Sequence, residues 1–163
     1  METLSLVKLS FLTKCRFFLE WLRVIAFYYK NIRFAITHII FLLSYLFINP
    51  YRVSRCFMQR LGKEDVYTYG ETPLTTLEVI AKSCQITTKD SVIELGCGRG
   101  LNLVWLNDFI GCQTWGVDFV PTFIKIARSI LSVFRRPKIL IEEKNYFDID
   151  FSEATVVILL DPF

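Results

Sequence analysis

The sequence predicts an α/β fold, in which helices cover a parallel β-sheet, preceded by a hydrophobic helical arm at the N-terminus. Two observations support this prediction. After residue 65, short apolar runs that suit buried strands alternate with segments of helical periodicity, which is the pattern of a parallel sheet. Before residue 64, the chain is apolar and basic without that alternation. We therefore expect an arm over residues 1–64 and an α/β unit over residues 65–163.

The composition argues against several classes of protein. Hydrophobic residues make up 53% of the 163 residues and charged residues 21%, which is not the composition of a disordered chain. The five cysteines form no Cys-x-x-Cys pair and His38 is the only histidine, which argues against a zinc site and a Cys–His nucleophile. We expect reduced thiols and no metal site.

Charge is distributed unevenly along the chain. Residues 1–63 contain ten Lys and Arg against two acidic residues, a net charge of +8. Residues 64–163 contain nine against fourteen, a net charge of −5. Because phosphate contacts need clustered cations, the acidic unit argues against nucleic acid as its main partner.

Two helices are expected in the arm. Leu4–Tyr29 is apolar with basic side chains on one face, which is typical of an amphipathic helix at a membrane surface. No charge interrupts residues 34–51, which as a helix would span about 27 Å against a hydrocarbon core of about 30 Å. Asn49 and Pro50 indicate a turn that ends this helix near Ile48.

The arm therefore predicts membrane association through residues 1–50. Basic residues flank the apolar stretch on both sides, so an interfacial or re-entrant arrangement on the cytoplasmic leaflet fits better than one oriented span. This would place the α/β unit on the cytoplasmic side. The alternative is that the two helices pack on the unit behind them, as in a soluble protein.

The elements of the α/β unit follow in order. Thr72 and Pro73 suit an N-cap and the first position of a helix. Helices are expected near residues 101–109 and 121–133, and strands at Ser91–Leu95, Gln113–Val117, Ile139–Glu142 and Ala154–Leu160. Right-handed crossovers would place the carboxyl ends of all the strands on one side of the sheet, where ligands bind.

A glycine-rich loop follows the first of these strands. Its glycines let the backbone turn sharply and approach a ligand. A dinucleotide fingerprint would need glycine at position 101, where leucine stands. An acid before the loop is also unfavourable beside a pyrophosphate but suits a cationic amine. The pattern favours S-adenosylmethionine over NAD, with these cofactor-binding residues: Glu94, Gly96, Cys97, Gly98 and Gly100.

The second strand ends in an acidic residue. Asp118 lies twenty-two residues after Gly96, where a carboxylate can accept both hydroxyls of a ribose. Phe119 is placed to cover an adenine face. The alternative role for Asp118 is a carboxylate at the start of the helix that begins with Pro121.

Residues 66–163 resemble the class I S-adenosylmethionine-dependent methyltransferases. Glu94-x-Gly96-x-Gly98-x-Gly100 is similar to their first motif, and Asp118 to the acid of their second strand. The resemblance implies a Rossmann-like fold. It also implies that Asn145, which stands where many members carry an acid after the third strand, hydrogen-bonds the adenine amine.

A narrower resemblance precedes the glycine loop. Val66-Tyr67-Thr68-Tyr69-Gly70-Glu71-Thr72 is similar to the cofactor loop of the non-SET histone lysine methyltransferases, the disruptor-of-telomeric-silencing family. It implies that Tyr69, Glu71 and Thr72 lie near the sulfonium and that Tyr69 and Thr72 close over the cofactor. It also implies an acceptor site at Asp161-Pro162-Phe163, where that family has Asn-Asn-Phe. The candidate catalytic residues are thus Tyr69, Asp161 and Phe163. The alternative for residues 69–73 is a turn and helix cap.

These resemblances imply methyl transfer from S-adenosylmethionine, with a protein lysine as the acceptor. Residues 161–163 are also similar in part to the Asp-Pro-Pro-Tyr motif of amino-methylating nucleic-acid enzymes, and a small-molecule acceptor stays open. A complete class I domain has further strands after the fourth. We therefore expect the N-terminal half of such a domain, active if the fold is completed. The alternatives are a truncated, inactive membrane-anchored remnant and one half of a split gene.

Overall fold

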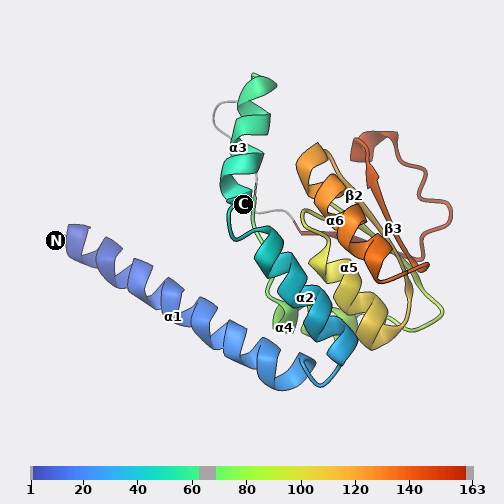
Figure 1. The fold of residues 1–163 in the computed structure, drawn as a ribbon, viewed down its shortest axis with the longest axis horizontal. Coiled ribbons are helices and arrows are strands. Elements are labelled where there is room, and N and C mark those ends of the chain that lie inside the picture. The colour runs from blue at the N-terminus through green and yellow to red at the C-terminus, as the bar shows by residue number, and fades with distance from the viewer. Residues whose placement is uncertain (1, 63–68, 161–163) are drawn as a thin grey trace.

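The computed structural model describes the backbone of residues 2–62 and 69–160, and side chains from residue 12 onward within those ranges. Four helices precede the first strand, and the N-terminal one extends away from the rest (Figure 1). These helices are α1 (Glu2–Tyr28), α2 (Ile32–Ser44), α3 (Pro50–Arg60) and α4 (Leu74–Ser83). The remaining elements are β1 (Ser91–Leu95), α5 (Leu101–Trp105), a π-helical turn (Leu106–Ile110), β2 (Gln113–Asp118), α6 (Pro121–Val133), β3 (Ile139–Glu143), a 3₁₀ turn (Tyr146–Asp148) and β4 (Val156–Leu159).

The strands form one parallel sheet in the order β3-β2-β1-β4. Each predicted strand is present within a few residues of its expected bounds, and helices α5 and α6 connect them as expected. Because β1 lies in the middle of the sheet, the loop that follows it is flanked by the ends of β2 and β4. The predicted α/β fold with a Rossmann-like parallel sheet is confirmed.

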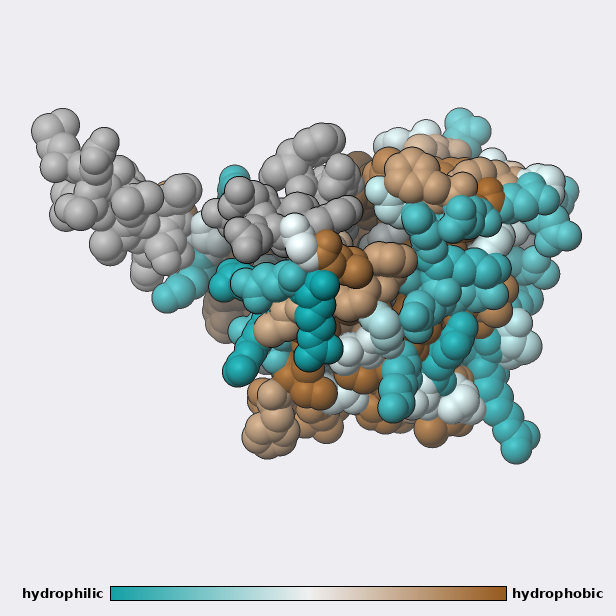
Figure 2. Space-filling view, turned by 90° about the horizontal axis from the view of Figure 1, so that it is seen from above, coloured by the Kyte–Doolittle hydropathy of each residue, from teal (hydrophilic) through white to brown (hydrophobic). Residues whose placement is uncertain are grey.

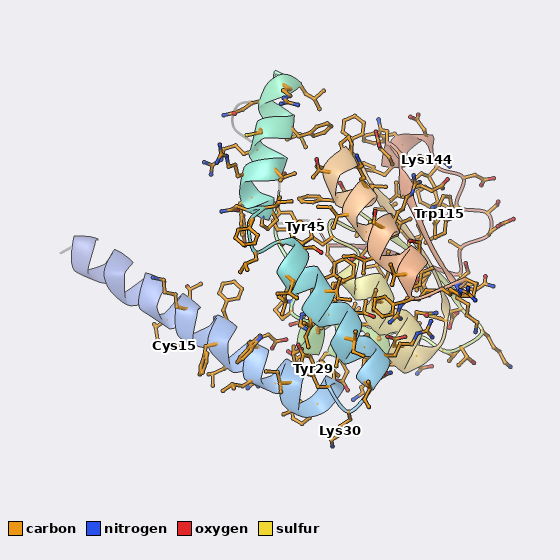
Figure 3. All side chains as sticks on the ribbon, in the orientation of Figure 1. Cys15, Tyr29, Lys30, Tyr45, Trp115 and Lys144 are labelled. Carbon is orange, nitrogen blue, oxygen red and sulfur yellow. The ribbon has the colours of Figure 1, made fainter. Side chains whose placement is uncertain are left out.

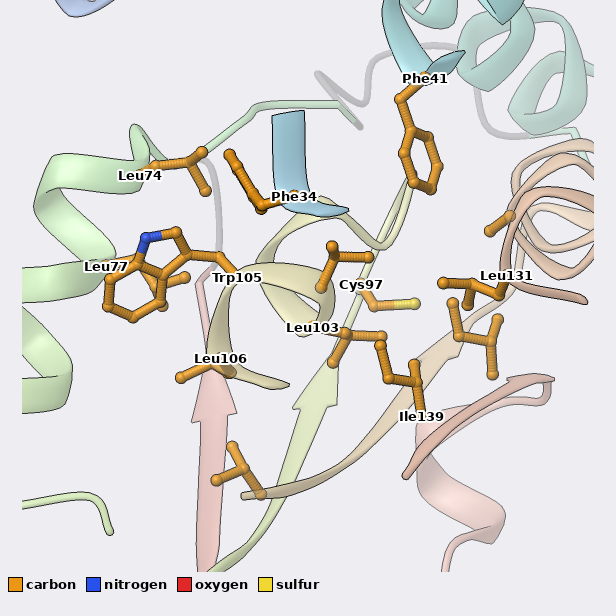
Figure 4. Packing of buried hydrophobic residues seen from close by; sticks show 14 of the residues in the cluster. Phe34, Phe41, Leu74, Leu77, Cys97, Leu103, Trp105, Leu106, Leu131 and Ile139 are labelled. Carbon is orange, nitrogen blue, oxygen red and sulfur yellow. The ribbon is translucent and has the colours of Figure 1, made fainter. Parts of the chain in front are cut away.

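Helices cover one face of the sheet. Val92, Ile141 and Ile158 belong to the main core, where side chains from α2, α4 and α5 also meet (Figure 4). The alternate residues Ile93 and Val117 belong to a separate small cluster on the other face. Strand residues point alternately to the two faces, so one sheet carries both clusters. The loop after β1 and the start of α5 therefore rest on this packed core, to which Cys97 and Leu103 belong.

Helix α2 packs on the sheet-covering helices. Phe34 and Phe41 are fully or almost fully buried, and α2 contacts both α5 and α6. Its thirteen residues span about 20 Å, well short of a bilayer core of about 30 Å. Among the described residues no helix is both long enough and apolar enough to cross a membrane. The predicted membrane location is therefore wrong, and Phe34, Phe41 and Tyr45 of this segment are buried against protein.

The face seen from above carries hydrophilic and hydrophobic side chains side by side (Figure 2). Part of α2 and α1 remains exposed and apolar, for example Ile32 and Phe17. The polar α3 begins where the sequence indicated only a turn. Asn49 accepts hydrogen bonds from the N–H groups of Tyr51 and Arg52, and Pro50 occupies the first helical position. The Asn-Pro pair thus starts one helix rather than merely ending another.

Helix α4 begins one residue later than predicted. Pro73 is its N-cap residue and makes no side-chain capping bond, so Thr72 is not the cap. Glu20 of α1 supplies the missing acceptor, because its carboxylate receives the Thr75 backbone N–H at 3.1 Å and the Thr75 hydroxyl at 2.7 Å. This contact fixes α1 to the start of α4.

A buried ion pair joins the segment after α6 to the π-helical turn, and a hydrogen bond from the same arginine reaches α2. Arg136, whose side chain is fully buried, donates to the carboxylate of Asp108. Its other terminal nitrogen donates to the Thr37 hydroxyl at 2.8 Å. Close by, Arg33 donates to the carbonyl oxygens of Phe134 and Arg135 at 3.0 and 3.3 Å. Helix α2 is thus held by directed polar contacts as well as by apolar packing.

His38 is part of the same packed layer. Its ring lies 5.6 Å from the ring of Phe34, centroid to centroid, and its Nδ1 is 3.1 Å from the Tyr29 hydroxyl. Burial lowers the pKa of His38 to about 4, with the charge of Arg99 acting in the same direction. The histidine is therefore neutral at pH 7 and serves the core.

Candidate functional site

The glycine loop turns tightly between β1 and α5. The N–H groups of Gly96 and Cys97 both donate to the carbonyl oxygen of Val117 on β2, at 2.8 and 3.0 Å. Gly100 has a φ of +80°, and a Cβ there would lie 2.8 Å from the Ile141 side chain. A larger residue would be strained and would collide with β3, so position 100 requires glycine.

Glu94 lies at the base of this loop and is 3% exposed. One carboxylate oxygen accepts a hydrogen bond from the Asn102 amide at 2.7 Å, while Oε2 is buried without a partner. Burial, with a contribution from the charge of Asp118, raises the pKa of Glu94 to about 8. A buried carboxylate with a free oxygen can accept a hydrogen bond from a cationic donor.

Asp118 connects the end of β2 to the glycine loop. Its Oδ2 accepts the Gly98 N–H at 2.7 Å and its Oδ1 accepts the Val120 N–H at 2.8 Å. Burial raises the pKa of Asp118, although these N–H groups favour the ionised form. Each oxygen keeps a second lone pair, so the carboxylate can still accept further donors.

Phe119 is 44% exposed and contacts α3, since its ring meets the ring of Phe57 edge-on at 5.5 Å. Asn145 follows β3, the neighbour of β2, and its side-chain oxygen accepts the Phe147 N–H at 3.2 Å. Both predicted adenine contacts thus lie at carboxyl ends of adjacent strands. The amide nitrogen of Asn145 remains the group that could meet a ligand.

The segment before α4 lies against the glycine loop. Glu71 forms an ion pair with Arg99 of that loop, and the Tyr69 hydroxyl also donates to Glu71. The Arg99 guanidinium lies 4.9 Å above the ring of Tyr45, at the end of α2 on the side of α6 (Figure 3). Three separate parts of the chain therefore meet at Arg99.

A cavity of about 50 Å³ lies between these two loops. It brings together seven of the predicted site residues: Tyr69, Thr72, Glu94, Gly96, Cys97, Gly98 and Gly100. Asp118 is joined to it through Gly98, whereas Phe119 and Asn145 lie outside its lining. The predicted residues Asp161 and Phe163 fall outside the described residues.

The sequence assigned no role to two polar residues of the site, Arg99 and Asn102, and only a general role to a third, Glu71. Arg99 and Asn102 bind Glu71 and Glu94, and Glu71 itself bridges Arg99 and Tyr69. A signal was present for the first pair, because Arg99 and Glu71 carry opposite charges in two segments that were both expected at the same cofactor. Asn102 stands two residues into the helix that leaves the loop, at a position where the sequence offers no comparable signal.

Comparisons with known proteins identify solved structures of similar fold. No protein-family model and no curated protein matches the chain. Solved structures do match. An RNA methyltransferase from Salinibacter ruber, in complex with S-adenosyl-L-homocysteine, has 24% identity and a TM-score of 0.52 over 55% of this chain and 60% of its own. A protein-L-isoaspartate O-methyltransferase has 14% identity and a TM-score of 0.51 over 55% of this chain and 29% of its own.

These identities establish the fold alone. The chain spans less than two thirds of either methyltransferase. The two also differ in what they modify, so the shared part is the scaffold and not one acceptor site. The chain therefore shares the Rossmann-like fold of these two methyltransferases.

Proposed function

We propose that this chain binds S-adenosylmethionine at the glycine loop and serves the transfer of its methyl group to a protein lysine. The observation that carries the proposal concerns Glu94. This buried residue lines the cavity, and its Oε2 has no hydrogen-bond partner. On a methyltransferase fold, this free oxygen suits the ammonium group of the cofactor.

The other residues of the site fit the remaining parts of the same cofactor. Asp118, at the end of β2, would accept the ribose hydroxyls with its remaining lone pairs. The exposed ring of Phe119 would cover the adenine, and the amide of Asn145 would reach its edge. Thr72 and the loop glycines would surround the methionine part. In this proposal residues 65–163 are the N-terminal half of the cofactor-binding domain.

S-adenosylmethionine supplies a methyl group on a sulfonium, which leaves the protein to position the acceptor and to exclude water. Burial raises the pKa of Tyr69 far above its ordinary value, and the neighbouring Glu71 adds to this shift. Its hydroxyl therefore stays protonated and acts as a hydrogen-bond donor rather than as a base. Removal of a proton from the lysine would fall to another group, for which Asp161 is our candidate.

A protein lysine is our proposed acceptor because Tyr69-Gly70-Glu71-Thr72 lines the cavity beside the glycine loop. This is the place expected from the resemblance to the non-SET lysine methyltransferases. The proposal can be tested by incubating the full chain with radiolabelled S-adenosylmethionine and, separately, lysine-containing peptides and RNA. Label on peptide lysine would support it. Label on RNA alone would refute the acceptor, and binding without transfer would leave only a cofactor-binding half.

Binding itself can be tested by calorimetric titration with S-adenosylhomocysteine in buffers of different ionisation enthalpy. Because the pKa of free Glu94 is about 8, a cationic ligand that ionises it should release a proton at pH 7. We expect the measured binding enthalpy to depend on the buffer for the parent chain and to be independent of the buffer for Glu94→Gln. Absence of binding by the parent chain would refute the proposed function.

A further inference from the structure

The cavity between the two loops is too small for its proposed ligand. It measures about 50 Å³, whereas sites for small molecules of this size occupy roughly 300–1,000 Å³. The residues that could bind the ligand are therefore present, but the space is closed. Something must move before S-adenosylmethionine or its product can enter.

The contact that closes the cavity is the ion pair between Glu71 and Arg99. One terminal nitrogen of Arg99 donates a hydrogen bond to a carboxylate oxygen of Glu71, and the Nε lies within ion-pair distance of the other oxygen without donating to it. The Arg99 side chain is 12% exposed and that of Glu71 41%. Partial burial reduces the screening that weakens an ion pair at the surface.

The ring of Tyr69 completes the closure. A Cβ placed on Gly98 would lie 3.4 Å from this ring, so the ring rests directly on the glycine loop. Tyr51 of α3 and Phe123 of α6 each lie 5.1 Å from it, centroid to centroid. The Tyr69 hydroxyl donates to the same Glu71 carboxylate that binds Arg99. The ring and the ion pair are therefore linked through Glu71.

Other polar contacts that hold this segment are few. Within the ranges 2–62 and 69–160, no backbone hydrogen bond ties residues 69–72 to the rest of the chain. The first backbone bonds occur at Pro73, whose carbonyl accepts the N–H groups of Thr76 and Leu77 in α4. The polar attachment of the segment to the glycine loop is thus concentrated in one ion pair, and the Tyr69 hydroxyl of the same segment donates to its carboxylate.

We propose that the Glu71–Arg99 ion pair is a latch that keeps residues 69–72 closed over the glycine loop, and that it opens to admit the cofactor. The proposal rests on the proposed function, because it takes S-adenosylmethionine as the ligand. Glu71 and Arg99 are in this view positioning residues that control access. The cofactor binds only to the open form, so the closed population slows its association.

The test is a double-mutant cycle on the full chain, with Glu71→Gln, Arg99→Gln and the two combined. Association of S-adenosylhomocysteine would be followed by surface plasmon resonance on immobilised protein. Each single variant should raise the association rate constant on the order of tenfold, equivalent to about 1.4 kcal/mol. The double variant should be no faster than either single one, because the same contact is lost in all three.

Two controls accompany the cycle. Lys82→Gln breaks an exposed ion pair with Glu78 and should leave the association rate unchanged. Arg99→Lys keeps the charge but loses the guanidinium hydrogen bond to Glu71, so its rate should lie between those of the parent chain and Arg99→Gln. This conservative variant also serves if Arg99→Gln does not fold.

Hydrogen exchange without ligand provides an independent readout. Peptides covering residues 69–72 should exchange faster in both single variants than in the parent chain, while β1 should be unchanged. Parental association rates together with parental exchange would overturn the latch, and so would additive effects in the double variant. If the parent chain does not bind S-adenosylhomocysteine, the proposed function fails, whereas the exchange data still decide whether the ion pair holds the loop.

Discussion

Removing the Asp108 carboxylate should be among the most destabilising single changes in this protein. The Arg136 side chain is fully buried and that of Asp108 is 4% exposed, so Asp108→Ala leaves a guanidinium in the interior with the Thr37 hydroxyl at 2.8 Å as its nearest acceptor. Loss of one partner from a buried ion pair costs about 3–5 kcal/mol. At about 2–4 °C per kcal/mol for a chain of this length, the unfolding midpoint should fall by about 6–20 °C.

The assay is urea unfolding followed by circular dichroism, with thermal unfolding in parallel. Replacing both residues, as Asp108→Leu with Arg136→Met, should cost less than Asp108→Ala because no charge is left buried. Lys82→Ala, which breaks an exposed pair, should change the free energy of unfolding by less than about 1 kcal/mol. If Asp108→Ala lowered the free energy of unfolding no more than Lys82→Ala does, the ion pair would be solvated, which would refute the prediction that its loss leaves a buried charge.

Three further predictions concern packing and pH. Gly116→Ala should lower the free energy of unfolding by about 1–3 kcal/mol, because its Cβ would lie 2.3 Å from Leu103, and Leu103→Ala should partly restore it. The pKa of Glu94 is raised to about 8, so its carboxyl binds a proton more tightly in the folded state. The contribution of Glu94 to the free energy of unfolding should therefore fall from about pH 4.5 to pH 8, and Glu94→Gln should remove that contribution in urea titrations. The pKa of His38 is lowered to about 4, so its contribution is complete above about pH 6.5 and is lost as the pH falls towards 4. His38→Gln should flatten acid unfolding over that range, and an unchanged profile would contradict the buried neutral ring.

The first strand could be predicted because a strand whose two faces are both buried is a short continuous apolar run. Ser91–Leu95 is such a run, and its bounds in the structure are the predicted ones. The location of α2 could not be predicted in the same way. Hydropathy reports only that Phe34 and Phe41 should leave water, and it does not distinguish a lipid environment from the surfaces of α5 and α6.

Some residues of the site could likewise be predicted from the local sequence and others could not. Glu94 and the glycines could be found because they are contiguous and serve one backbone turn. The ion pair of Glu71 and Arg99 depends on how two segments twenty-eight residues apart are placed. The partner that Glu20 provides for Thr75 depends on a helix fifty-five residues away. Such contacts arise from tertiary packing, which local pattern and propensity do not encode.

The docking of α2 also sets an order of events during synthesis. Thr37 reaches its hydrogen-bond donor on Arg136, ninety-nine residues later in the chain. At a translation rate of about 5–20 residues per second, α2 waits about 5–20 s after its own emergence before that partner exists. Through this interval its apolar face, with Phe34 and Phe41, has no α6 to cover it. The contacts of this face with α6 and Arg136 therefore form only after residues 121–136 have been made.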